Sequence, residues 1–347
     1  MAKRLVVCCD GTWNSLTQKA PTNVVKVKDA VAAVDPAGTK QLVHYHEGVG
    51  TGKRLWDRLA GGAFGWGLSA NVRDAYRFVV EHYEPGDELF FFGFSRGAYT
   101  ARSVVGLIRN CGVLLPRHAS RVDEAYRLYR DRDPATGPAS PAAREFRESF
   151  SHQDVTPVRF VGVWDTVGAL GIPLSGGRLL NLLNRRWQFH DTQLTSTVQS
   201  AFQALAVDEH RKAFRPAVWQ PSPGADGQER EQVWFCGAHS DVGGGYPEQG
   251  LSGLALHWLV ARAEKCGLVF TPGAFDGLPP ADDLGVLHNS LNRLYKWFGS
   301  IDREIGVVDP PSESLASCAQ HRHENMRPPY APPNLVEYLK SPRITEV

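Results

Sequence analysis

The chain has 347 residues, of which 42% are hydrophobic and 22% are charged, and its formal net charge is +1. This composition is sufficient for a sizeable core and excludes wholesale disorder. The balanced charge, without a Lys/Arg block, argues against nucleic-acid binding, and no run of 18 apolar residues predicts a membrane span.

The N-terminal end of the chain leads directly into a strand at Leu5–Cys9, which is apolar throughout, as in a strand buried on both faces. No long apolar region precedes it, so we expect no secretory signal. The chain has six cysteines and no Cys-x-x-Cys pair, which is typical of reduced core thiols. We therefore expect a cytoplasmic protein, with export by machinery that uses no N-terminal signal as the alternative.

Strand and helix patterns alternate along the first two thirds of the chain. Apolar runs predict strands, and apolar residues at helical spacing predict helices. The expected strands are 5–9, 42–45, 88–92, 158–164 and 232–235, and the expected helices lie within 22–34, 72–83, 98–108 and 251–267. This alternation is typical of an α/β fold with a mainly parallel central sheet flanked by helices.

We interpret residues 1–347 as a single domain of this kind, with a core at about 3–267. The irregular segment 168–193 is predicted to form a lid-like insertion. Residues 268–347 are rich in proline and weakly patterned, so we expect them to form an irregular peripheral segment.

The pentapeptide Gly93-Phe94-Ser95-Arg96-Gly97 matches the Gly-x-Ser-x-Gly pattern and stands between a predicted strand and a predicted helix. A turn this short forces its central residue into a strained conformation, and the glycines let the two backbones approach. The serine oxygen then projects above the sheet, where the helix N-terminus favours negative charge. Ser95 is therefore the predicted nucleophile of an α/β-hydrolase-like fold.

A nucleophilic serine needs a base to take its proton and an acid to orient that base. Asp165 and His239 each follow an apolar strand, at the carboxyl ends where α/β sheets place their sites. They also follow Ser95 in the order, acid and then histidine, that this fold uses. We predict His239 as the base and Asp165 as its acid, with Asp241 and Asp10 as competing acids. Asp241 could instead brace a turn through its side chain.

Two further groups of residues are candidates for the site. His210 is a rival base, although its charged, helix-like surroundings favour a role outside catalysis. Asp10-Gly11-Thr12 ends the first strand, and backbone N–H groups near Gly11 and Thr12 are candidate oxyanion donors together with that of Arg96. Asp10 is also a candidate for shaping the pocket. The alternative is that this segment is a simple turn before a helix cap.

Six blocks of the chain, in this order, carry recognisable motifs. They are Asp10-Gly11-Thr12-Trp13-Asn14, Gly48-Val49-Gly50-Thr51-Gly52, Gly93-Phe94-Ser95-Arg96-Gly97-Ala98, Trp164-Asp165-Thr166-Val167-Gly168, Asp208-Glu209-His210-Arg211 and Gly237-Ala238-His239-Ser240-Asp241-Val242-Gly243-Gly244-Gly245-Tyr246. Together they span roughly residues 3–265 and resemble the DUF2235, or Tle1-like, family of α/β-hydrolases. That family includes phospholipases delivered by bacterial type VI secretion, so the resemblance implies ester hydrolysis on lipids. It assigns no catalytic role to Asp165.

The leading hypothesis is a serine hydrolase that cleaves carboxylic esters through an acyl-enzyme, with a phospholipase or lysophospholipase as the finer expectation. Its expected partners are a lipid or small-molecule ester and, transiently, a membrane surface. No cofactor is expected, and the oligomeric state is left open.

Two alternatives belong to other classes. The first is a metal-dependent hydrolase in which strand-end residues hold a divalent cation, although no compact ligand motif occurs. Its candidate ligands are Asp10, Asp165, His239 and Asp241. The second is a hydrolase fold that serves as a non-catalytic binding module.

Overall fold

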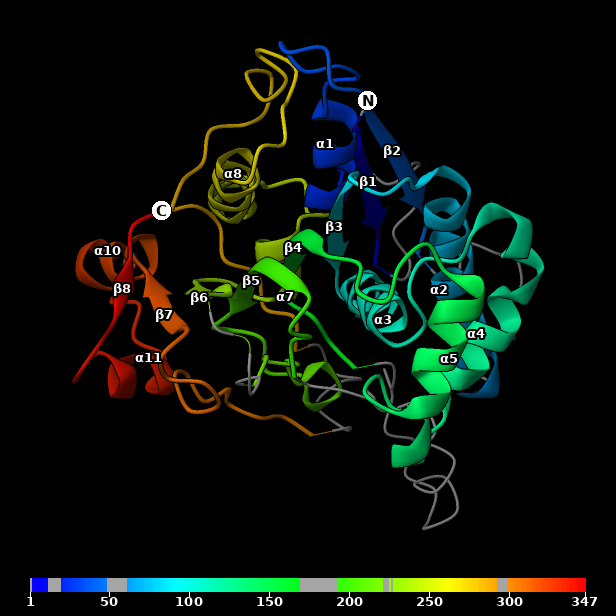
Figure 1. Cartoon of the computed structure of the whole chain (residues 1–347). Coiled ribbons are helices and arrows are strands. Elements are labelled where there is room, and N and C mark those ends of the chain that lie inside the picture. The colour runs from blue at the N-terminus through cyan, green and yellow to red at the C-terminus, as the bar shows by residue number, and fades with distance from the viewer. Residues whose placement is uncertain are drawn as a thin grey trace.

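Eight strands of the described residues form one central sheet in a computed structural model of the chain (Figure 1). The structure describes residues 2–11, 20–48, 61–168, 193–220, 225, 227–291 and 299–347, with side chains at all of these except 61–66. The strand order is β2-β1-β3-β4-β5-β6-β7-β8, and each neighbouring pair is parallel. The predicted α/β class with a mainly parallel sheet flanked by helices is confirmed.

Strands and helices alternate along most of the chain. The strands are β1 (Arg4–Cys9), β2 (Gln41–His46), β3 (Glu88–Phe94), β4 (Val158–Trp164), β5 (Val198–Ala206), β6 (Glu229–Phe235), β7 (Glu313–Ala316) and β8 (Ile344–Thr345). The α-helices are α1 (Asn23–Ala30), α2 (Gly61–His82), α3 (Arg96–Cys111), α4 (Val122–Arg130), α5 (Pro141–Phe150), α7 (His239–Gly243), α8 (Gly250–Lys265), α10 (Ser317–Asn325) and α11 (Pro333–Tyr338). Short 3-10 helices are η1 (Pro116–Arg121), η2 (Pro134–Thr136) and η3 (Lys212–Phe214).

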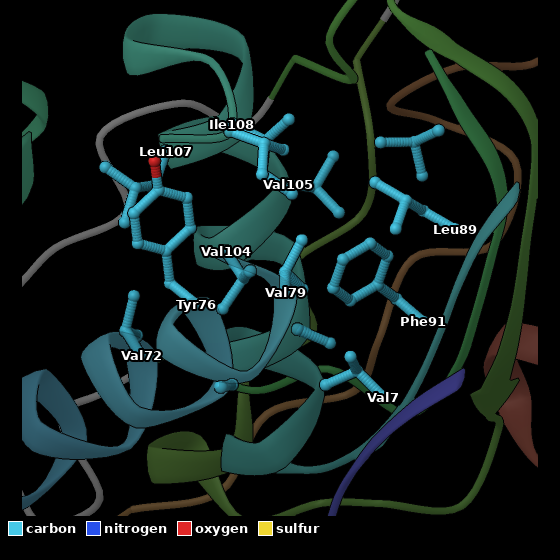
Figure 2. Close-up of a cluster of buried hydrophobic side chains, with 14 of the residues drawn as sticks. Val7, Val72, Tyr76, Val79, Leu89, Phe91, Val104, Val105, Leu107 and Ile108 are labelled. Carbon is cyan, nitrogen blue, oxygen red and sulfur yellow. The ribbon is translucent and has the colours of Figure 1, made fainter. Parts of the chain in front are cut away.

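The two faces of the sheet are covered by different helices, because successive residues of a strand point to opposite sides. Val7 and Phe91 lie on the face covered by α2, α3, α4 and α5, in one buried cluster with Tyr76 and Val79 of α2, and Figure 2 shows side chains of this cluster. Val6 belongs to the cluster on the opposite face, beneath α1 and α8. Burial on both faces explains why these strands are apolar throughout.

The C-terminal segment is less peripheral than the sequence indicates. Within it, β7 pairs with β6 and β8 pairs with β7, so the segment extends the sheet. Leu315 of β7, Ala319 of α10 and Leu335 of α11 share a third buried cluster with Trp234 of β6. The expectation of an irregular peripheral segment is corrected for these residues. Strands of four and two residues are too short to produce a recognisable period.

The strands that precede the predicted site residues end side by side at one edge of the sheet. Phe94 at the end of β3 pairs with Trp164 at the end of β4, and Ala206 of β5 pairs with Phe235 of β6. The loops after β3, β4 and β6 carry the predicted nucleophile, acid and base. Sheet topology therefore brings these three loops to a common edge.

Two further sequence predictions concern a lid and membrane-spanning helices. The predicted lid at 168–193 lies outside the described residues except at its two ends, 168 and 193. Among the helices that the structure describes, none is long and apolar enough to cross a membrane.

Candidate active site

The turn from β3 into α3 places Ser95 in a backbone conformation that non-glycine residues rarely adopt. Its φ is 58° and its ψ is −123°. The two glycines of the motif are required by space. A Cβ on Gly93 would lie 2.5 Å from Cα of Ala98, and a Cβ on Gly97 would lie 2.1 Å from the carbonyl oxygen of Cys9. The turn therefore packs directly against the beginning of α3 and the end of β1.

Ser95, His239 and Asp165 form a continuous hydrogen-bonded chain. The hydroxyl of Ser95 lies 2.8 Å from Nε2 of His239, and Nδ1 of the same ring lies 2.5 Å from Oδ2 of Asp165. Ser95 and His239 are 4% and 5% exposed, and Asp165 is fully buried. A carboxylate, an imidazole and a hydroxyl in this sequence of contacts is the arrangement that activates a serine nucleophile.

The imidazole of His239 is held in an aromatic and largely water-free environment. Its ring centroid lies 4.6 Å from that of Phe94 and 4.9 Å from that of Phe214. Burial lowers the pKa of His239 below the ordinary histidine value, and the hydrogen bond and charge of Asp165 oppose this effect only in part. A neutral imidazole can accept the serine proton, so the lowered pKa favours the state that a general base requires.

Asp165 is itself held by a residue that the sequence analysis missed, Arg303. The guanidinium of Arg303 donates to Oδ1 of Asp165 over 2.6 Å and to Oδ2 over 3.1 Å. Burial alone would raise the pKa of Asp165, but the charge of Arg303 and the hydrogen bond from His239 together hold it below its usual range. The carboxylate therefore stays ionised although it is fully buried.

Glu209 is a second buried carboxylate next to His239. Its Oε2 accepts the backbone N–H of His239 over 3.3 Å, and both of its oxygens bind the side chain of Arg211. Burial raises the pKa of Glu209, but the hydrogen bond and charge of Arg211 outweigh burial, so the net pKa is lowered. Glu209 thus holds the first residue of α7 at its backbone.

Comparison with known protein families settles the relationship of this chain. The model of one family, described as T6SS, phospholipase effector Tle1-like, catalytic domain, matches residues 3–262. The chain belongs to this family. The resemblance inferred from the six sequence blocks is confirmed, and the matched region contains Ser95, Asp165 and His239.

Similarities of the Tle1-like chain to individual proteins are more distant. The uncharacterized protein YEL023C of Saccharomyces cerevisiae is 28% identical over 239 residues, which is 64% of this chain and 33% of the yeast protein. The crystal structure of an uncharacterized protein from Pseudomonas aeruginosa has 17% identity and a TM-score of 0.49, and the match covers 80% of this chain and 48% of that one. The Tle1 effector bound to the VgrG spike from the type 6 secretion system has 21% identity and a TM-score of 0.39, with 72% and 52% covered. The Tle1-like chain therefore spans about a third to a half of the length of these proteins.

The two secondary candidates of the Tle1-like chain lie away from the serine hydroxyl. Asp241 accepts the backbone N–H of Ala238 and binds the backbone and ring of His288, so it braces the start of α7 as a turn residue. His210 lies in the loop after β5, not in a helix, and its Nδ1 pairs with Asp302 at 3.0 Å. The helix-like surroundings expected for His210 were wrong, because β5 was not recognised in the sequence.

The segment after β1 lies next to the nucleophile turn, as the predicted oxyanion site requires. Asp10 is buried, and its carboxylate accepts the backbone N–H of Gly11, the hydroxyl of Thr22 and the hydroxyl of Tyr45. The N–H of Gly11 is therefore engaged by Asp10 in this structure. Thr12 lies outside the described residues. Arg96 is the first residue of α3, so its backbone N–H belongs to the helix N-terminus beside Ser95.

The ligand set of the metal-dependent alternative is not assembled. Asp10 and Asp241 make their hydrogen bonds elsewhere, and Asp165 binds His239 and Arg303. Within the described part of the chain, no three His, Cys, Asp or Glu side chains form a group that could hold a metal ion.

A cavity of about 580 Å³ lies farther along α3, away from the hydroxyl. Its walls include Arg102 and Arg109 of α3 and Trp219, and neither Ser95 nor His239 lines it. The hydrogen-bonded side chains of the candidate site therefore lie outside this cavity.

Proposed function

We propose that this chain is a lipase-type serine hydrolase that cleaves carboxylic esters of lipids through an acyl-enzyme on Ser95. The observation that supports it most strongly is the chain of hydrogen bonds from Asp165 through His239 to Ser95. Membership of a family described as a phospholipase effector catalytic domain supports the lipid class of the substrate. Phospholipids and lysophospholipids are the substrates we propose, and contact with a membrane surface would then be transient.

In the first half of the proposed reaction, Oγ of Ser95 attacks the ester carbonyl carbon while Nε2 of His239 takes the hydroxyl proton. The carbonyl oxygen becomes an oxyanion, which the N–H of Arg96 at the α3 N-terminus would stabilise. The carbon–oxygen bond to the alcohol then breaks. His239 returns its proton to the departing oxygen, which leaves as the alcohol, and the acyl group stays on Ser95.

In the second half, water attacks the acyl carbon and gives one proton to His239. The bond between the acyl carbon and Oγ breaks, Oγ takes the proton back from His239, and the carboxylic acid departs. Asp165 keeps its negative charge in both halves and stabilises the imidazolium that forms beside it. The low pKa of Asp165 fits this role, since a carboxylate that protonated readily could not supply that charge.

The first test replaces the nucleophile. We expect Ser95→Ala to lower kcat/KM for p-nitrophenyl butyrate and for fatty-acid release from phosphatidylcholine vesicles by at least about 10³-fold, because no acyl-enzyme can form. Ser240→Ala is the matched control, since Ser240 is next to His239 in sequence, is only partly buried and takes no part in the hydrogen bonds that join Asp165, His239 and Ser95. Circular dichroism verifies the fold of both variants.

A fluorophosphonate probe separates this function from that of a non-catalytic binding module. The probe reacts covalently with an activated serine, so wild type should be labelled at Ser95 and Ser95→Ala should not be labelled. An unlabelled wild-type protein, or a Ser95→Ala variant with unchanged turnover, would refute the proposed nucleophile.

A further inference from the structure

We propose that Arg303 is a positioning residue that fixes the orientation of Asp165 and, through it, aims the His239 ring at Ser95. The inference rests on the proposed function and adds to the reaction a residue that lies beyond the family match, which ends at residue 262. Arg303 contacts neither the proposed nucleophile nor the imidazole in any hydrogen bond of the described residues. Its effect must therefore pass through Asp165.

Arg303 is bound at both ends of its guanidinium. Nη1 donates to Oδ1 of Asp165 over 2.6 Å and to the carbonyl of Ala206 over 2.8 Å. Nη2 donates to Oδ2 of Asp165 over 3.1 Å and to the carbonyl of Phe214 over 2.6 Å. The planar fork of arginine matches this arrangement, whereas the single ammonium of lysine cannot reproduce it. Arg303 thus connects the loop after β4 to the end of β5 and to η3.

These contacts leave Asp165 little rotational freedom. Oδ1 also accepts the backbone N–H of Ala206 over 3.0 Å, and Oδ2 also binds Nδ1 of His239. The backbone of Asp165 has a φ of 39°, in the left-handed region, so neighbouring contacts must hold it there. Arg303 supplies two of these contacts to the side chain and fixes the plane of the carboxylate that faces the imidazole.

Arg303 also offsets the charge of Asp165 in a fully buried site. The side chains of both residues have no exposed surface. The charged groups that face His239 directly are Asp165 and Glu209, which favour the imidazolium, and Arg211, which disfavours it. Without Arg303, less positive charge would offset that of Asp165, and the pKa of His239 would rise although burial and Arg211 still lower it.

The inference is tested with two substitutions that separate charge from geometry. Arg303→Met removes both the charge and the hydrogen bonds to Asp165. Because Asp165 then loses its fixed orientation, we expect kcat/KM for p-nitrophenyl butyrate to fall by about 10²-fold, the cost of a misplaced catalytic group. Because the positive charge is lost, the acid limb of the pH profile of kcat/KM should move to higher pH. Arg303→Lys keeps a positive charge but cannot bridge both carboxylate oxygens and both carbonyls. Its kcat/KM should therefore fall while the acid limb stays close to that of wild type.

Arg230→Met is the matched control. Arg230 lies near the start of β6, away from the end that leads to His239, and binds the buried Asp309. Loss of this ion pair tests the general effect of removing an arginine from a buried aspartate. The acid limb of Arg230→Met should coincide with that of wild type.

Direct titration of the His239 ring by NMR, with histidine-labelled protein and His239→Gln to assign the signal, gives a readout that does not depend on turnover. A raised His239 pKa in Arg303→Met, relative to wild type and Arg230→Met, supports the inference. An unchanged pKa and acid limb, or full kcat/KM in Arg303→Lys, overturns it. If Arg303→Met does not fold, the Arg303→Lys kinetics decide. Failure of the proposed function is distinguishable from failure of this inference, because the Ser95→Ala variant would then turn over ester at the wild-type rate.

Discussion

The ionisation states of a few buried side chains decide what the site can do. Asp165 is buried but ionised, because Arg303 and His239 hold its pKa low. His239 is buried and neutral, because burial lowers its pKa more than Asp165 raises it. A charged acid next to a neutral base is the resting state from which a serine can be deprotonated.

The pH dependence of turnover follows from the state of His239. In the proposed reaction His239 accepts the serine proton only when its ring is neutral, and the pKa of His239 lies below the ordinary value of 6.5. We therefore expect kcat/KM for p-nitrophenyl butyrate to persist as the pH falls through 6.5 and to be lost only at lower pH. The free energy of unfolding should also decrease as the pH falls below 6.5, because His239 binds a proton at higher pH in the unfolded chain than in the folded chain.

A pH series of initial rates, with circular dichroism at each pH to separate inactivation from unfolding, checks this prediction. An acid limb centred at or above the ordinary histidine pKa, in folded protein, would contradict it.

At the scale of elements, the β3–α3 turn depends on how closely β1 approaches it. The first residues of α3 lie so near the end of β1 that no side chain fits at Gly97. This packing explains the second glycine of the motif and places the segment after β1 beside Ser95. The motif therefore describes contact between elements as well as a local turn.

Gly97→Ala tests this packing. Its Cβ would lie 2.1 Å from the carbonyl oxygen of Cys9 and 2.4 Å from that of Asp10, and backbone atoms of a central strand cannot move aside freely. We expect a loss of about 1–3 kcal/mol in the free energy of unfolding, as for overpacked sites, together with reduced kcat/KM because the Ser95 turn shifts.

Urea unfolding and ester hydrolysis measure the two effects. Gly277→Ala is the control, since a Cβ at this exposed glycine has no atom within 4 Å, and it should leave both quantities unchanged. Wild-type stability and activity in Gly97→Ala would show that β1 does not constrain the turn.

At the scale of the whole molecule, residues after 299 complete the structure around the site. They contribute β7 and β8 to the sheet and Arg303 to Asp165. The indole of Trp234 in β6 donates to Glu313 of β7, and the amide of Gln232 in β6 donates to Ser312. We therefore propose that residues 1–347 fold as one domain.

Two truncations test this proposal. Removal of all residues after Gly267 would expose the edge of β6 and would leave Asp165 without the guanidinium of Arg303. We therefore expect no cooperative thermal transition and no esterase activity. Removal of the residues after Ser341 takes away the two-residue strand β8 and Arg343, which binds the carbonyls of Pro310 and Pro311 at the exposed surface, and should leave both largely intact. A cooperative, active chain ending at Gly267 would show that the C-terminal segment is dispensable.

Local patterns in the sequence were sufficient for the fold class and for the three residues that meet at the site. Apolar runs marked β1 to β4 and β6, and Thr22 caps α1 as its residue type suggests. The strand-end positions of Ser95, Asp165 and His239 follow from the rule that parallel strands present their loops at one edge. Each of these signals is carried by a few consecutive residues.

The contact of His239 with Asp165 and not with Asp241 or Asp10, the strand β5 and the contact of Arg303 with Asp165 were decided by tertiary structure alone. β5 contains Gln203, a polar residue that is buried because it binds Gln232 on the neighbouring strand, so its sequence lacks a clean apolar run. Arg303 meets Asp165 across 138 positions of the chain. A single arginine in a weakly patterned segment carries no local signal, because its partner is set by how the strands and loops pack.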